Sequence, residues 1–86
     1  MNPANVLKYP VSTEKAIRLM ESQNKIVFVV DRKSNKNDVQ RAFELMFKVK
    51  VTDVKTVITP EGKKRAYIKL SAESPALDIA TQLGMM

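Results

Sequence analysis

The clearest periodic pattern in the chain is that of an amphipathic helix near its middle. Apolar side chains recur at i, i+3, i+4, i+7 and i+8 in the run Val39, Ala42, Phe43, Met46 and Phe47. Asn35 and Asp38 precede the run at the spacing of a reciprocal N-terminal cap, with Asp in place of the usual Glu. The pattern therefore predicts a helix that follows Asn35, buries one continuous apolar face and ends near Val49.

A second helix is predicted before it. Ser12 or Thr13 offers a side-chain oxygen as its cap, and Glu14 stands in the first turn, where the helix dipole favours an anion. The helix runs to about Gln23. Its inward stripe consists of Ala16, Ile17 and Met20.

A third helix is predicted at the end of the chain. Ser74 supplies its cap, and Pro75 takes the first helical position, where the missing N–H would have had no partner in any case. The inward face consists of Ala76, Ile79, Ala80 and Leu83. Gly84 suits the end of this helix, because glycine readily adopts the left-handed conformation found there.

Two strands are predicted in the first half. Lys25–Asp31 (KIVFVVD) is apolar at every interior position, which is the pattern of a central strand covered on both faces. A shorter strand is predicted over Val6–Tyr9 and is ended by Pro10. The preceding residues, Met1–Asn5, are expected to be loose.

The stretch Lys48–Leu70 has the pattern of two strands joined by one turn. Apolar and polar residues alternate along both arms, and the inward positions of the second arm are Ala66, Ile68 and Leu70. In the turn Thr59-Pro60-Glu61-Gly62, proline presets one φ and glycine supplies a positive one. Because Val51 is out of phase with Val54, we expect the first strand to begin near Val51 with a bulge before Val54.

These elements follow one another in the order β-α-β-α-β-β-α. Helices packed on an antiparallel or mixed sheet form an α+β sandwich, which is the predicted fold class. At 86 residues the chain is expected to be a single domain spanning residues 1–86, with no internal repeat or linker.

Positive charge is concentrated in the hairpin. The whole chain has 15 Lys and Arg against 9 Asp and Glu, a net charge of +6, and Lys48–Leu70 alone holds seven basic and two acidic residues. A basic hairpin is a common way to present cations to a polyanion, so the composition favours an anionic partner. The alternative is a basic surface that is solvated and binds nothing.

The composition excludes most chemistry. The chain has no Cys and no His, which removes thiolate sites, the commonest metal ligand and the commonest general base. With two Gly residues it has no phosphate-cradling loop. We therefore predict no enzyme activity, no catalytic residue, no metal and no cofactor. The first ten residues lack the pattern of a signal peptide and the longest apolar run, Ile26–Val30, is too short to cross a bilayer, so we expect a cytosolic protein.

The outward face of the second hairpin arm carries the best candidate binding surface. Arg65, Tyr67 and Lys69 alternate there and continue the Lys63-Lys64 cluster. Cation, aromatic and cation on one face can hold phosphates and stack a base. The alternative is that Tyr67 packs under a helix while the cations are solvated, and the spacing alone favours neither.

Four segments together resemble the large-subunit ribosomal protein L twenty-three family. KKRAYIKLS at 63–71, followed by Ile79, resembles the family signature, and YPVSTEKA at 9–16 resembles its opening motif. SNKNDV at 34–39 resembles the start of its second helix, and Phe47–Thr59 resembles its third strand. The segments span almost the whole chain in the order that the family has.

The resemblance implies a structural constituent of the large ribosomal subunit, with a four-stranded, largely antiparallel sheet and packed helices. It implies large-subunit rRNA and neighbouring ribosomal proteins as partners, beside the polypeptide exit tunnel of the cytoplasmic ribosome. Factors that meet the nascent chain dock there, including the signal recognition particle, and Glu14 matches the family's acidic docking residue. The candidate rRNA contacts are Lys8, Lys15, Lys33, Lys36, Lys63, Lys64, Arg65, Tyr67 and Lys69.

Some features depart from parts of the family. The short turn PEGKKR lacks the long basic loop of bacterial members, and Lys48 stands where those members carry a second acidic docking residue. The basic N-terminal extension of eukaryotic members is absent, so the compact chain resembles archaeal members. The alternative from another functional class is a basic adaptor that binds an acidic protein and no RNA.

Overall fold

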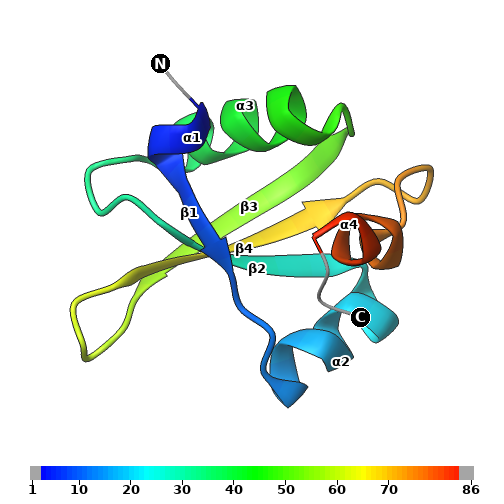
Figure 1. Ribbon diagram of the computed structural model, residues 1–86, viewed down its shortest axis with the longest axis horizontal. Coiled ribbons are helices and arrows are strands. Elements are labelled where there is room, and N and C mark those ends of the chain that lie inside the picture. The colour runs from blue at the N-terminus through cyan, green and yellow to red at the C-terminus, as the bar shows by residue number, and fades with distance from the viewer. Residues whose placement is uncertain (1–2, 84–86) are drawn as a thin grey trace.

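The computed structural model describes residues 3–83, which form a four-stranded sheet with helices on both faces (Figure 1). The elements are α1 (Pro3–Val6), β1 (Leu7–Pro10), α2 (Glu14–Gln23), β2 (Lys25–Val30), α3 (Lys36–Phe47), β3 (Val51–Ile58), β4 (Lys64–Leu70) and α4 (Ala76–Gln82). The predicted α+β class and the order β-α-β-α-β-β-α are confirmed, with one short helix added in front.

The start of the chain differs from the prediction. Met1–Asn5 are predicted to be loose, but Pro3–Val6 form α1, so the prediction is wrong for residues 3–5. Helix α1 packs against α3, and Val6 is 6% exposed in the main core. This packing orders a segment that is too short to be helical alone. Residues 1 and 2, and the Gly84 expected at the end of the last helix, lie outside the described residues.

The strands lie in the order β1-β2-β4-β3, and every neighbouring pair is antiparallel. Strands β2 and β4 are therefore central, and β1 and β3 are the edges. The register between β3 and β4 shifts between Val51 and Asp53, which confirms the expected bulge before Val54. In the turn, the Gly62 N–H donates to the Thr59 carbonyl at 2.9 Å and Gly62 has a φ of 82°, as the sequence predicts.

One face of the sheet carries the main core, beneath α1 and α3. Phe28 of β2 packs against Phe43 and Phe47 of α3, with ring centroids 5.6 and 6.2 Å apart. Phe43 and Ile68 are fully buried. Met46, predicted to point inward, is 43% exposed, and that part of the prediction is wrong. Phe43 and Phe47 fill the space beneath the last turn of α3 and leave Met46 at its flank.

The opposite face is only partly covered, by α2. Ala16 of α2 and Val11 pack against Val27 and Val29 of β2. Every residue of 26–30 is buried, which confirms that β2 is covered on both faces. In Figure 1, α3 and α2 lie on opposite sides of the sheet, and α2 lies against β2 and leaves β3 uncovered.

Two of the predicted helix caps are present. The Asp38 N–H donates to Asn35 Oδ1 at 2.9 Å and the Asn35 N–H donates to Asp38 Oδ2 at 3.3 Å, so the reciprocal cap of α3 is confirmed. For α2, Thr13 is the cap and not Ser12, because the Ala16 N–H donates to Thr13 Oγ1 at 3.3 Å.

Helix α4 has a cap that the sequence did not indicate. Pro75 is its N-cap residue, so the prediction of a Ser74 cap with Pro75 inside the helix is wrong. The Asn24 side chain, at the C-cap of α2 with a φ of 54°, takes that role: its Oδ1 accepts from the Ala76 N–H at 2.6 Å. Its Nδ2 donates to the carbonyls of Leu70, Ser71 and Ser74.

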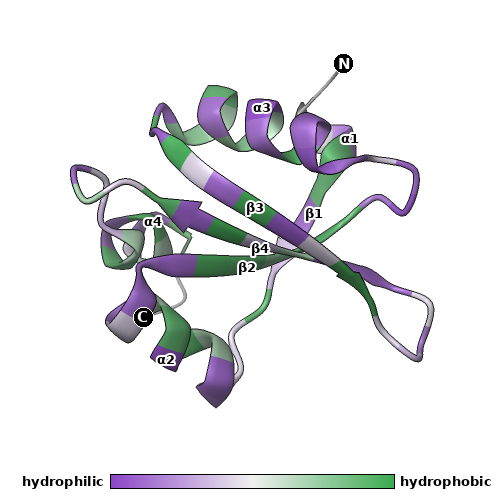
Figure 2. Ribbon diagram, turned by 180° about the vertical axis from the view of Figure 1, so that it is seen from behind, coloured by the Kyte–Doolittle hydropathy of each residue, from purple (hydrophilic) through white to green (hydrophobic). Residues whose placement is uncertain are grey.

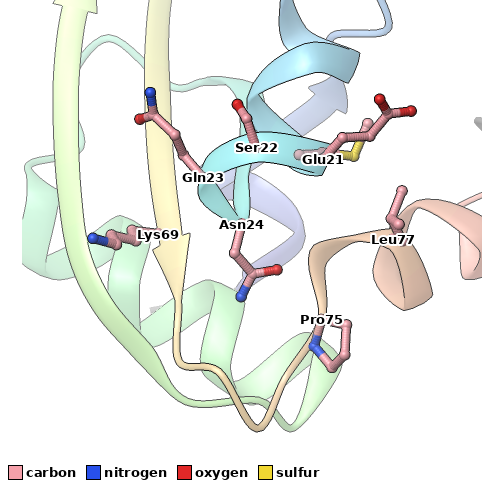
Figure 3. Close-up of a pocket in the computed structure, with 8 residues that line it drawn as sticks. Glu21, Ser22, Gln23, Asn24, Lys69, Pro75 and Leu77 are labelled. Atoms are coloured by element: carbon pink, nitrogen blue, oxygen red, sulfur yellow. The ribbon is translucent and has the colours of Figure 1, made fainter.

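Asn24 therefore ties three parts of the fold together: the end of α2, the end of β4 and the start of α4. Figure 3 shows Asn24 at this junction, in a cavity of about 550 Å³ that Lys69 and Leu77 also line. Leu77 is 40% exposed, whereas Ala76, Ile79 and Ala80 are buried as predicted.

Candidate nucleic-acid interface

Three rows of side chains cross the sheet on the α2 side. Antiparallel pairing forms the rows Lys25–Lys69–Asp53, Val27–Tyr67–Lys55 and Val29–Arg65–Val57, each running from β2 through β4 to β3. Since directly paired residues point to the same face and α2 covers β2, the β4 and β3 parts of the rows stay accessible. We call this part the open face, and it consists of Asp53, Lys55, Val57, Arg65, Tyr67 and Lys69.

The open face is cationic. Lys55 and Lys69 are exposed and Arg65 is partly buried, against one acidic residue, Asp53. Val57 lies among them with 45% of its surface exposed. Figure 2 shows hydrophilic and hydrophobic residues interspersed along β3, which contributes buried Val51 and Val54 to the core and Asp53, Lys55 and Val57 to the open face.

Tyr67 lies where α2 and the open face meet. It is partly buried and packs against the cluster that includes Ala16, Val27 and partly buried Leu19. The sequence left open whether Tyr67 stacks on a base or packs beneath a helix, and the structure shows that it packs at least partly beneath α2. Its row partner Lys55 is exposed, so cations still flank the ring on the accessible side.

The first turn of α2 adds to this surface. Thr13 and Lys15 line a narrow cleft together with Arg65 and Tyr67, so the structure brings Lys15 near the open face. Glu14 is exposed, and its Oε1 lies 2.7 Å from Arg18 Nη2 one turn later. Such exposed pairs contribute little stability, so Glu14 remains accessible to a partner.

The turn of the hairpin carries its own carboxylate. The backbone N–H of Glu61 and the Thr59 side chain stabilise the Glu61 carboxylate, and together with the nearby Arg65 and Lys63 they hold the pKa of Glu61 below the ordinary 4.5. Glu61 is therefore ionised at neutral pH and offsets part of the positive charge of the hairpin.

The remaining predicted contacts form two other groups. Lys8 and Lys63 line one cavity at the β1 edge. Lys33 and Lys36 are exposed around the start of α3. Lys64 points to the α3 side of the sheet, where its ammonium donates to the carbonyl of Ser34 in the loop before α3. The structure thus gathers Lys15, Arg65, Tyr67 and Lys69 and leaves the other five elsewhere.

Two cations beside these surfaces were missed by the sequence reasoning. Lys55 belongs to the open face because it pairs with Tyr67, and Arg32 lines the same cavity as Lys8 and Lys63. The alternation of Lys55 with Val54 was a usable signal for its outward direction. No local signal marks Arg32, because its position depends on how the loop after β2 meets the hairpin turn.

The structure offers no metal site in its described part. Within residues 3–83, no group of three or more His, Cys, Asp or Glu side chains could hold a metal ion. Over the same residues, no helix is long and apolar enough to cross a membrane. What the described residues do present is a small α+β domain with a cationic sheet face.

Comparison with known proteins specifies the family. The family model of ribosomal protein L23 matches residues 5–76. The chain is 46% identical over 85 residues to the large ribosomal subunit protein uL23 of Methanococcus aeolicus and 52% identical over 85 residues to that of Methanothermobacter thermautotrophicus. Each alignment covers 99% of this chain and 99% of the relative. The chain belongs to the ribosomal protein L23 family, and its likeness to archaeal members is confirmed.

Membership of this family makes the chain a structural ribosomal protein and not an enzyme. Its place in the cell is the cytoplasmic ribosome.

Proposed function

We propose that this protein is held in the large ribosomal subunit by binding large-subunit rRNA through its open face. The observation that carries the proposal is the set of cations Lys55, Arg65 and Lys69, which are fixed on one sheet, with Lys55 and Lys69 exposed and Arg65 partly exposed beside α2. An RNA backbone is a dense line of negative charge, and a flat cationic surface on a sheet can contact several phosphates at once.

Rigidity adds to the electrostatic attraction. Lys69 and Arg65 come from the central strand β4, whose alternate residues Ala66 and Ile68 are completely buried. The backbone beneath the two cations is therefore fixed before RNA arrives, and less conformational entropy is lost on binding than with a flexible basic tail.

We further propose that the protein lies beside the exit tunnel and forms part of a docking site for nascent-chain factors. Glu14 supports this part, since it is exposed at the start of α2 and close in sequence to Lys15 at the edge of the open face. A protein bound to rRNA through the open face would still present the outer side of α2. The signal recognition particle is the factor that we propose for this site.

Sedimentation tests the proposal. Tagged protein is mixed with large and small subunits at physiological salt, with and without RNase treatment. We expect it to sediment with the large subunit and to be released by RNase. Association that survives complete removal of the rRNA would instead support a basic adaptor for an acidic protein.

A matched pair of variants locates the contact. K55A/K69A removes two exposed cations from the open face, whereas R41A/K50A removes two exposed cations elsewhere on the molecule. Co-sedimentation should weaken strongly for the first variant and little for the second. Equal weakening of both would mean that general charge and not the open face holds the protein.

A further inference from the structure

A second basic site lies where the hairpin turn meets the β1 edge. It is a cavity of about 340 Å³, within the range of roughly 300–1,000 Å³ that is usual for ligand sites. It is lined by Lys8, Tyr9, Val29, Val30, Asp31, Arg32, Gly62 and Lys63. We call it the hairpin notch.

Three cations line the hairpin notch from three separate segments. Lys8 comes from β1, Arg32 from the loop after β2, and Lys63 from the end of the turn. Arg32 lies directly against the turn, because a Cβ placed on Gly62 would be 3.7 Å from Arg32 Nη1. Cations that approach one hollow from separate segments are arranged to surround an anion.

The acidic residue in the lining is already engaged. Asp31 is partly buried, and its Oδ1 accepts a hydrogen bond from the Lys33 N–H at 3.0 Å. That bond belongs to the loop itself and does not pair Asp31 with any of the three cations. The hairpin notch therefore keeps a positive excess.

Tyr9 gives the hairpin notch an aromatic surface. Its ring is held by Lys63, whose Nζ donates to the Tyr9 hydroxyl at 3.1 Å and lies 5.8 Å from the ring centroid. Tyr9 nevertheless remains 46% exposed, because β1 is an edge strand. A fixed and exposed ring beside cations is the combination by which proteins bind the base and phosphate of one nucleotide together.

We propose that the hairpin notch binds one unpaired nucleotide of RNA. Its base stacks on Tyr9, and the adjoining phosphate is held by Lys8 and Arg32, with Lys63 orienting the ring. Paired bases are stacked inside a duplex and cannot reach Tyr9, so the site selects an unstacked nucleotide. The inference rests on the proposed binding of rRNA and specifies which element of the RNA this part of the surface takes.

The test uses the full chain and three probes: a ten-nucleotide oligouridylate, an RNA duplex of the same strand length and inorganic phosphate. Amide shifts are followed by NMR during each titration. We expect oligouridylate to shift Arg32 and Gly62 at lower concentration than the duplex or phosphate. Equal shifts with phosphate alone would reduce the notch to an anion site, and shifts confined to the open face would overturn the proposal.

Variants separate stacking from charge. Tyr9→Ala should weaken oligouridylate binding roughly 5- to 150-fold, whereas Tyr9→Phe keeps the stacking ring, loses only its hydroxyl bond to Lys63 and should weaken binding much less. K8A/R32A changes only exposed side chains and tests the phosphate contact even if Tyr9→Ala disturbs β1. Unchanged binding in K8A/R32A would contradict the proposal.

The same variants distinguish failure here from failure of the proposed function. If K55A/K69A loses rRNA while Tyr9→Ala and K8A/R32A bind rRNA and oligouridylate as wild type does, the hairpin notch is wrong and the open face stands. If wild-type protein binds no large-subunit rRNA, the proposed function itself fails.

Discussion

The two faces of the sheet are built from the same strands but differ in burial: one carries the main core and the other carries the open face. Along β4, the residues that point toward α3 are Ala66, Ile68 and Leu70, which are at most 2% exposed. Arg65, Tyr67 and Lys69 alternate with them along the strand, point the other way and form half of the open face. Helices α1 and α3 cover the first face, and α4 adds Ala76, Ile79 and Ala80 to its core, whereas α2 covers only the β2 part of the second face.

This difference shows how a domain of 86 residues provides both a core and a flat binding surface. Stability is concentrated on the α3 side, where burial of apolar area is nearly complete. The α2 side has a smaller cluster that fixes one helix and leaves cations uncovered. Substitutions on the two faces should therefore affect different measurements.

The largest expected effect lies on the covered face. Phe43 is 0% exposed and packs against Phe28 and Phe47, so Phe43→Ala should lower the free energy of unfolding by about 3–5 kcal/mol. Urea denaturation followed by circular dichroism measures the change. A loss below about 1 kcal/mol would mean that the core is not concentrated on this face.

The next effect is expected at the junction held by Asn24. Asn24→Gly tolerates the positive φ but removes one cap and three donated hydrogen bonds, so unfolding should become easier by about 2–4 kcal/mol. Asn24→Asp keeps the acceptor for the Ala76 N–H but turns a carboxylate toward three carbonyls. If Asn24→Asp had the same thermal unfolding midpoint as wild type, the role of the Asn24 amide as a hydrogen-bond donor would be contradicted.

On the open face, a single substitution should change binding and not stability. Lys55→Ala removes an exposed side chain from an edge strand, so its free energy of unfolding should stay within about 0.5 kcal/mol of wild type. Its affinity for large-subunit rRNA should fall. Wild-type affinity together with lowered stability would reverse the assignment of the two faces.

The smallest expected effect concerns Glu61. Because its pKa is lowered in the folded protein, ionised Glu61 stabilises the fold at pH values above the ordinary 4.5, and this contribution is lost as the pH falls through the lowered pKa. Glu61→Gln should lack this part of the acid dependence, and it should bind rRNA slightly more tightly at neutral pH. Unfolding curves measured across the acidic range, with wild type as reference, detect the difference. If Glu61→Gln had the same pH dependence of unfolding free energy as wild type, the stabilising role of ionised Glu61 would be contradicted.

Local patterns in the sequence were enough to predict most of the helices and strands. The predictions that were wrong or incomplete concern features that depend on contacts between residues far apart in the sequence. Asn35 and Asp38 are three residues apart, so their reciprocal cap was predictable. The cap of α4 was not, because Asn24 lies 52 residues from Ala76. Tyr67 was correctly placed on the outward side of its strand, but only the fold shows that α2 covers much of its ring.

The part of the candidate site that lies on one strand was predictable, and the part that depends on strand pairing was not. Arg65, Tyr67 and Lys69 share a face by simple alternation, as the structure shows. Lys64 is their neighbour in the sequence but points to the α3 side, where its ammonium bonds to the Ser34 carbonyl. Lys55 joins the site only through the pairing register of β3 with β4, which the sequence does not state.

The central claim is that the open face contacts rRNA phosphates, and the salt dependence of binding tests it most directly. Each lost phosphate contact should reduce the slope of log affinity against log salt by about 0.7–0.9. K55A/K69A should therefore have a slope about 1.4–1.8 smaller than wild type for a large-subunit rRNA fragment, and R41A/K50A an unchanged slope. Equal slopes for K55A/K69A and wild type would contradict the account.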